Sequence, residues 1–165
     1  MGTGYSGLFN GTQGSKNSRY HSSAKIMHER VKTWAENEIE TLETKSKRQR
    51  EKFNTASIVY DKETGKYYYG KNKGALAPGV RKNEQLFGEK GVLPKKSFNA
   101  FEVGNCAEVD AINQALNNGA KLENLYMYTI HTTKTNFGMG KKACENCTFA
   151  FKGRIKENHS GWEEL

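Results

Sequence analysis

The stretch GNCAEVDAINQAL, residues 104–116, contains the clearest helical pattern of the chain. Its apolar residues recur at the spacing of one helix face, at Val109, Ile112 and Leu116. Gly119 follows where a helix commonly ends, because glycine adopts the left-handed backbone without strain. The pattern predicts a helix from Asn105 to Asn118, with Cys106 and Glu108 in its first turn.

Outward from this helix, strands and helices alternate along the chain. The run ASIVYDKETGKYYYGKN, residues 56–72, predicts a hairpin that turns at 61–65, and LENLYMYTI, residues 122–130, predicts a buried strand. A second helix is expected to open at Cys144. The order helix, hairpin, helix, strand, helix indicates an α/β layered domain.

The N-terminal part has a different composition. Residues 1–20 are rich in Gly, Ser, Thr and Asn, which predicts a flexible linker before a single domain over 21–165. An amphipathic helix is expected over 23–52, with Ser22 or Ser23 as its cap and a basic stretch, KSKRQREK, at its end. That stretch either forms a solvated helix end or contacts phosphate.

A long segment without periodicity, residues 73–104, lies between the hairpin and the helix of residues 105–118. A loop of this length inside a compact domain is commonly functional. Its phenylalanines, Phe87, Phe98 and Phe101, are expected either to fill the core or to stack on nucleic-acid bases.

The charge of the chain is positive and unevenly distributed. Residues 1–100 carry 19 Lys and Arg against 10 Asp and Glu, whereas residues 101–165 carry 7 against 8. A basic flank beside a neutral segment suits a polyanion such as nucleic acid, although a solvated surface explains it as well. No apolar run approaches the length of a membrane span, so we expect no membrane partner.

The chain has three cysteines, Cys106, Cys144 and Cys147. An odd number favours a reducing compartment or a metal site over a disulfide framework. The Cys-x-x-Cys pair lies in the first turn of its helix, where both thiolates reach one ion, and a helix N-terminus favours the thiolate form. Three thiolates leave the fourth position of zinc open, as in a catalytic site, and Glu108 is placed to shuttle a proton there.

Several plainer interpretations remain open for these residues. Asn105 and Glu108 fit a helix capping box, and the Cys-x-x-Cys pair alone fits a redox motif. A structural zinc module would need a fourth ligand, for which His131 and His159 are candidates. A metal-independent nuclease toxin that uses a histidine is a further alternative.

The combination of Cys106-Ala107-Glu108 with Ala143-Cys144-Glu145-Asn146-Cys147 resembles the signature of the zinc-dependent cytidine deaminase-like superfamily. The commoner signature has His in place of Cys106 and Pro in place of Ala143. The resemblance covers residues 55–156, and the wording CAEVDAINQALNNGA followed by CENC is similar to the YwqJ-like deaminase domains of bacterial polymorphic toxins. It implies a three-layer α-β-α fold with a small mixed sheet of about three to five strands and zinc ligands at two helix N-termini.

The activity that the resemblance implies is hydrolytic deamination of cytosine to uracil in DNA. A zinc-bound hydroxide attacks C4, while Glu108 protonates N3 and then the leaving ammonia. RNA, free nucleosides and free nucleotides are alternative substrates, and a single or a double strand is equally compatible with the sequence. A non-catalytic zinc module that binds nucleic acid or a partner is the alternative of another class.

The resemblance also implies where the substrate binds. Asn72, after the hairpin, corresponds to an asparagine that holds the sugar or base, and the backbone of Ala107 contacts the pyrimidine edge. The loop over 131–143 lies where relatives read the flanking nucleotide, with His131, Asn136 and Phe137 as its candidates.

The resemblance finally implies a biological setting. The chain is expected to be a secreted bacterial effector that acts in the cytoplasm of a recipient cell, a reducing compartment that suits three thiolates. Its producer would need a cognate immunity protein, expected to be acidic because the effector is basic.

Overall fold

The predicted hairpin forms one edge strand and its neighbour in the sheet of the computed structural model, which describes residues 18–165. β1 (Thr55–Asp61) and β2 (Lys66–Lys71) pair antiparallel. The Gly65 amide donates to the Asp61 carbonyl at 2.8 Å and closes the turn, in which Gly65 has a φ of 78°. Glycine adopts this left-handed conformation without strain, so the turn agrees with the sequence prediction.

Two further strands complete a mixed sheet. β3 (Leu125–His131) pairs antiparallel with the free edge of β1, and β4 (Glu157–Asn158) pairs parallel with β3. The order is β2-β1-β3-β4, four strands in all. The prediction of an α/β domain with a small mixed sheet is therefore confirmed.

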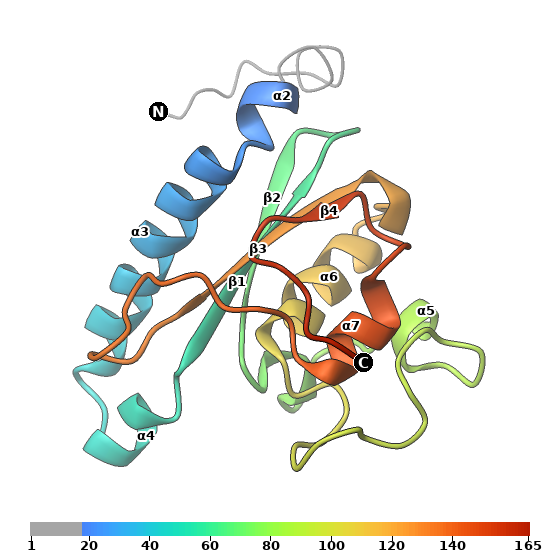
Figure 1. Cartoon of the computed structure of the whole chain (residues 1–165). Coiled ribbons are helices and arrows are strands. Elements are labelled where there is room, and N and C mark those ends of the chain that lie inside the picture. Colours follow the sequence, from blue (N-terminus) through green and yellow to red (C-terminus); the bar gives the residue numbers. More distant parts are fainter. Residues whose placement is uncertain (1–17) are drawn as a thin grey trace.

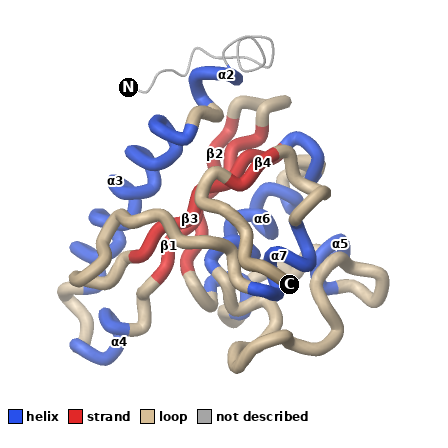
Figure 2. Tube along the Cα trace, in the orientation of Figure 1, coloured by secondary structure: helices blue, strands red, loops and turns tan. Residues whose placement is uncertain are grey.

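Helices surround this sheet, as Figure 2 shows. They are α2 (Ser18–His21), α3 (Ala24–Leu42), α4 (Lys47–Glu51), α5 (Glu84–Phe87), α6 (Ala107–Asn117) and α7 (Glu145–Phe151), with 3-10 turns η1 (Gly74–Leu76) and η2 (Leu122–Asn124). Among residues 18–165, no helix combines the length and the apolarity that crossing a membrane requires.

The sheet separates two apolar clusters. Because successive side chains of a strand point to opposite faces, Ile58 and Ile130 pack against α3, whereas Val59 and Met127 pack on the side of α6 and α7. The chain thus forms three layers, with α3 on one face of the sheet and α6 and α7 on the other (Figure 1).

The helix expected over 23–52 is interrupted. Ser23 caps α3 as predicted, accepting from the Ile26 amide, but α3 ends at Leu42. Ser46 then accepts from the Gln49 amide while the Gln49 side chain accepts from the Ser46 amide, and this capping box starts α4. The prediction of one continuous helix is wrong because Ser46 satisfies the first amides of a new one.

Two of the three loop phenylalanines do not fill the core. Phe98 and Phe101 are 53% and 63% exposed, whereas Phe87 packs partly against the apolar cluster beside α6. The loop contains two short helical elements, η1 and α5. The expectation of core phenylalanines is therefore wrong for Phe98 and Phe101.

The linker prediction extends beyond the part of the chain that the structure describes. Residues 1–17 lie outside it, and residues 18–20 belong to α2. The helical structure therefore begins before the predicted domain boundary at residue 21.

Candidate metal centre

The three cysteines meet where two helices begin. Cys106 is the N-cap of α6, Cys144 is the N-cap of α7, and Cys147 lies in the first turn of α7. Their sulfur atoms lie within 4.8 Å of one another, and no disulfide joins them. Zinc–thiolate bonds of about 2.3 Å fit one ion between three such sulfurs, so this donor set can hold a metal.

A close approach of strand and helix places Cys106 there. A Cβ atom on Gly70 of β2 would lie 2.4 Å from the carbonyl oxygen of Ala107, so only glycine allows this contact. The Asp110 carboxylate also accepts from the Lys71 amide at 2.9 Å. These two contacts hold the first turns of α6 against the end of β2.

Hydrogen bonds between the cysteines redistribute their protons. The Cys106 and Cys144 sulfurs are 2.7 Å apart. Bonds from Cys106 and Cys147, followed by the backbone amides of Cys147 and Asn146, lower the pKa of the Cys144 thiol. The same bonding to Cys144 raises the pKa of Cys106. Negative charge therefore collects on Cys144, and a bound cation would displace the remaining thiol protons.

Glu108 is a buried carboxyl group beside the cysteines. It is 3% exposed, and burial, followed by the negative charge of Cys144, raises its pKa to about 7. Its own backbone amide, Lys141 and a hydrogen bond from the Thr129 hydroxyl oppose the shift. A carboxyl group with this pKa can accept and release a proton near neutral pH, as a general acid or base must.

Glu108 is not held by the predicted capping box. Cys106, rather than Asn105, is the N-cap of α6, and no side chain caps the helix. Glu108 is then the second residue of the helix, whereas a capping box needs Glu at the third. The capping-box interpretation is wrong, and the carboxyl group points instead toward the sheet and Thr129.

The sheet supplies a polar floor at this end. Four polar residues of β1 and β3 face α6 in two register pairs, Thr55 with His131 and Ser57 with Thr129. The next pair along the same face, Val59 and Met127, is apolar and belongs to the core. The polar pairs therefore lie at the end of the sheet near the cysteines.

Three of the predicted substrate residues lie at this end of the sheet. Ala107 is buried in the first turn of α6, and His131 ends β3. The Asn72 amide side chain follows β2, where its oxygen accepts from the Asn54 and Thr55 amides and its nitrogen donates to the Lys52 carbonyl. Asn72 is thus engaged with the backbone on both sides.

The other two predicted substrate residues lie elsewhere. Phe137 packs into the apolar cluster beside α3, on the far face of the sheet from the cysteines. Asn136 is exposed in the same turn, which is anchored because His28 Nε2 lies 2.6 Å from the Gly138 carbonyl oxygen. The loop after β3 therefore folds toward α3, and the structure does not bring Asn136 or Phe137 to the cysteines.

Neither histidine completes the cysteine group. His159 lies near α3, where Nε2 is 2.6 Å from the Ser22 carbonyl oxygen and Nδ1 is 2.8 Å from the Glu157 carboxylate. His131 shares the face of the cysteines but is absent from the metal-binding group. Within residues 18–165, that group contains cysteines alone.

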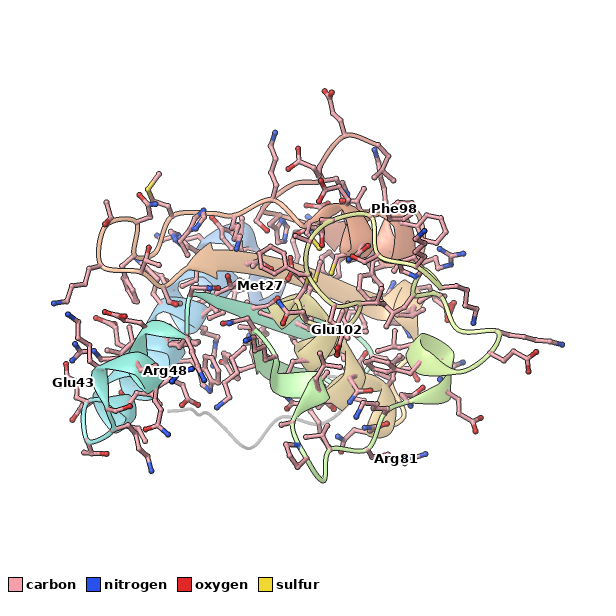
Figure 3. All side chains as sticks on the ribbon, turned by 90° about the horizontal axis from the view of Figure 1, so that it is seen from below. Met27, Glu43, Arg48, Arg81, Phe98 and Glu102 are labelled. Atoms are coloured by element: carbon pink, nitrogen blue, oxygen red, sulfur yellow. The ribbon has the colours of Figure 1, made fainter. Side chains whose placement is uncertain are left out.

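Sequence reasoning missed the residues that connect the long loop to the cysteines. The Asn146 side chain accepts from the Phe98 amide and donates to the Ser97 hydroxyl, and Glu145 accepts from Asn99 at 3.1 Å. Glu145 and Asn146 both lie between Cys144 and Cys147 in the sequence. Their polar side chains in that position were the sequence signal that could have indicated such contacts. The anchored loop holds exposed Phe98 next to α7 (Figure 3).

Comparisons with protein-family models, with curated proteins and with solved structures returned no match to this chain.

Proposed function

We propose that this protein is a zinc-dependent deaminase that converts cytosine to uracil in nucleic acid, with DNA as the preferred substrate. The observation that supports it most is the juxtaposition of three thiols at two helix starts with one buried carboxyl group, Glu108. Such a donor set, with a carboxyl group beside it that is not a ligand, is the arrangement that zinc deaminases use.

The residues take distinct roles in this proposal. Cys106, Cys144 and Cys147 would hold the zinc ion, which when bound supplies a water molecule of lowered pKa. Hydrolysis forms a bond from that water's oxygen to C4 of cytosine and breaks the bond from C4 to the exocyclic nitrogen. Glu108 takes a proton from the water, delivers it to N3 and then moves a proton to the departing nitrogen, so that ammonia leaves and uracil remains.

The plainer alternatives have less support. A structural zinc module lacks a fourth ligand within the described chain, because His159 is engaged elsewhere and His131 is outside the cysteine group. A redox pair explains Cys144 and Cys147 but leaves Cys106 and the buried Glu108 without a role. The pKa of Glu108, raised to about 7, is the value that proton transfer at neutral pH requires.

A polymeric substrate is supported by charge. The exposed residues of α4 include Lys47 and Arg48, and Figure 3 shows Arg48 on the side of the molecule away from Phe98 of the long loop. The ion pair of Lys47 with Glu51 is long, at 3.9 Å, and both side chains are largely exposed, so the pair neutralises little of the charge of Lys47. Phosphates attract such residues by releasing counterions. RNA and free nucleotides remain alternative substrates for the same deamination reaction.

We extend the proposal to a setting that suits the same features. A secreted bacterial effector of this kind would act in the reducing cytoplasm of a recipient cell, where three thiols stay available for metal. Its cognate immunity protein would carry acidic groups, because the net charge of the chain is +8.

The decisive experiment is incubation of the zinc-loaded protein with single- and double-stranded DNA and RNA, followed by sequencing for cytosine-to-uracil changes. We expect conversion by the wild type and a loss of at least about 100-fold in Glu108→Ala, because proton transfer contributes about 10²- to 10⁴-fold. Glu102→Gln removes an exposed carboxylate from the nearby loop and serves as the matched control. Equal conversion by wild type and Glu108→Ala would refute the mechanism.

Metal content tests the ligand set separately. We expect about one zinc per chain by mass spectrometry or elemental analysis, and its loss in the double variant Cys106→Ala/Cys144→Ala. Zinc retained by the double variant would refute the assignment of these ligands.

A further inference from the structure

The strongest observation outside the proposed machinery concerns Lys141. Its backbone amide donates to the Thr129 carbonyl oxygen at 2.8 Å, in a segment that pairs with the end of β3 through the bridge between Gly140 and Ile130. The side chain then crosses the sheet, and Nζ donates to the Thr55 hydroxyl of β1 at 2.8 Å. The ammonium group is therefore held over the polar floor, on the face of the sheet that also carries the cysteines.

This ammonium group has no ion-pair partner among residues 18–165. Lys141 is half-buried, and no carboxylate of residues 18–165 lies within ion-pair distance of it. The Thr55 hydroxyl accepts one of its three N–H donors and in turn donates to the Asn54 side chain at 2.8 Å. A partly desolvated charge is unfavourable unless it is paired, so an anion bound at Nζ would be stabilising.

The neighbours of Lys141 place that anion beside the proposed reaction centre. Lys141 lies close enough to Glu108 for their charges to interact, and its charge, after burial, lowers the pKa of His131. His131 faces the same floor opposite Thr55, and its lowered pKa favours a neutral ring that can donate one N–H. A single cation with an imidazole donor beside it suits a phosphate group, for which lysine is a common ligand.

We infer that Lys141, supported by Thr55 and His131, binds a phosphate group of the nucleotide whose base reaches Glu108. This inference rests on the proposed function and narrows its substrate class to phosphate-bearing substrates over free nucleosides. The phosphate belongs either to a mononucleotide or to a polynucleotide, which offer the same chemistry to Nζ.

The first test compares deoxycytidine, dCMP and an oligodeoxynucleotide with one cytosine as substrates of wild type, Lys141→Met and Lys142→Met. Methionine keeps the aliphatic stem without the charge, and Lys142 is the exposed neighbour of Lys141. Because a hydrogen bond to a charged group is worth 1.5–3 kcal/mol, we expect Lys141→Met to lower the ratio of kcat/KM for dCMP over deoxycytidine about 10- to 100-fold. Lys142→Met should keep the wild-type ratio, and Lys141→Arg should recover part of it.

Each outcome of this comparison decides the inference. A loss on both dCMP and the oligonucleotide supports a contact to the phosphate of the target nucleotide itself. A loss confined to the oligonucleotide supports a contact that only a polymer provides. An unchanged kcat/KM for both dCMP and the oligonucleotide in Lys141→Met would overturn the inference, because Lys141 would then contact no phosphate. An equal loss on deoxycytidine would also overturn it, because Lys141 would then act on the base or on Glu108.

A binding measurement separates this inference from the proposed function. Calorimetric titration of dCMP and of inorganic phosphate into zinc-loaded Glu108→Ala, with and without Lys141→Met, needs no turnover. If binding to Glu108→Ala depends on Lys141 while the zinc-loaded wild type deaminates none of the substrates, the phosphate site is supported and the deaminase proposal is refuted. Turnover by the wild type, with neither binding nor turnover dependent on Lys141, would support the deaminase proposal and refute the phosphate site. Circular dichroism of each variant shows that the fold is kept.

Discussion

Gly70 lets β2 and α6 approach closely enough to hold Cys106 at the sheet, and Gly70→Ala perturbs that packing directly. The added Cβ would lie 2.4 Å from the Ala107 carbonyl oxygen and 2.5 Å from the Ala111 nitrogen. Real Cβ atoms do not come within 3.0 Å of such atoms. Both obstacles are backbone, so no side-chain rotation relieves them and α6 itself must shift.

The expected loss follows from what α6 is packed against. Its buried face, with Val109 and Ile112, belongs to the main apolar cluster, so a shift of the helix strains a close-packed core. Overpacking of this kind costs about 1–3 kcal/mol, which lowers Tm by about 2–4 °C per kcal/mol for a chain of this length. The same shift moves Cys106 relative to Cys144, so zinc affinity should fall as well.

Two assays and one matched control make this prediction decisive. Urea denaturation of the metal-free protein measures the free energy of unfolding, and competition with a chromogenic chelator measures zinc affinity. Gly140→Ala is the control, because the nearest atom to its new Cβ would be the Tyr128 hydroxyl oxygen at an ordinary 3.4 Å. If Gly70→Ala proves as stable as Gly140→Ala and binds zinc equally well, the close contact of β2 with α6 is refuted.

Two further predictions concern stability. Asn72→Ala removes one side chain that bonds three backbone groups, so we expect a loss of about 1–3 kcal/mol in urea denaturation, and a neutral effect would contradict this bracing role. Burial, followed by the charge of Asp61, raises the pKa of Tyr60 to about 12, above its usual value of 10.0. The folded protein therefore favours the neutral Tyr60 phenol, which contributes to the free energy of unfolding in full below about pH 10. This contribution, about 2 kcal/mol, is lost as pH rises through about 12. Tyr60→Phe should flatten the decline of the urea midpoint between pH 9 and pH 11.5, and an unchanged decline would contradict the assignment.

Local patterns predicted those features that depend on neighbouring residues. The hairpin around Gly65 and the α6 helix follow from turn chemistry and apolar periodicity, which act over a few residues. The interruption between α3 and α4 also has a local cause, because Ser46 and Gln49 form a capping box. The charged residues around them nevertheless resemble one continuous helix.

Other features depend on how distant segments pack. Phe137 and Cys144 belong to the same stretch between β3 and α7, yet the turn at Gly138 docks on α3 while Cys144 lies on the opposite face. Asn72 was predicted to contact a substrate, but its amide bonds the segment before β1. No spacing in the sequence distinguishes these outcomes, because each is decided by contacts between residues far apart in the chain.

The sequence by itself determined that Cys106, Cys144 and Cys147 stand at helix starts, because helix periodicity and the Cys-x-x-Cys spacing are local properties. Only the tertiary structure decided that the sulfurs gather within 4.8 Å, since that requires β2 to approach α6 at Gly70 and α7 to pack beside it. It also decided that Lys141 crosses the sheet to Thr55, a contact 86 residues apart in the chain. Helix and turn signals act over a few residues, whereas the burial and charge of this site come from segments that only folding brings together.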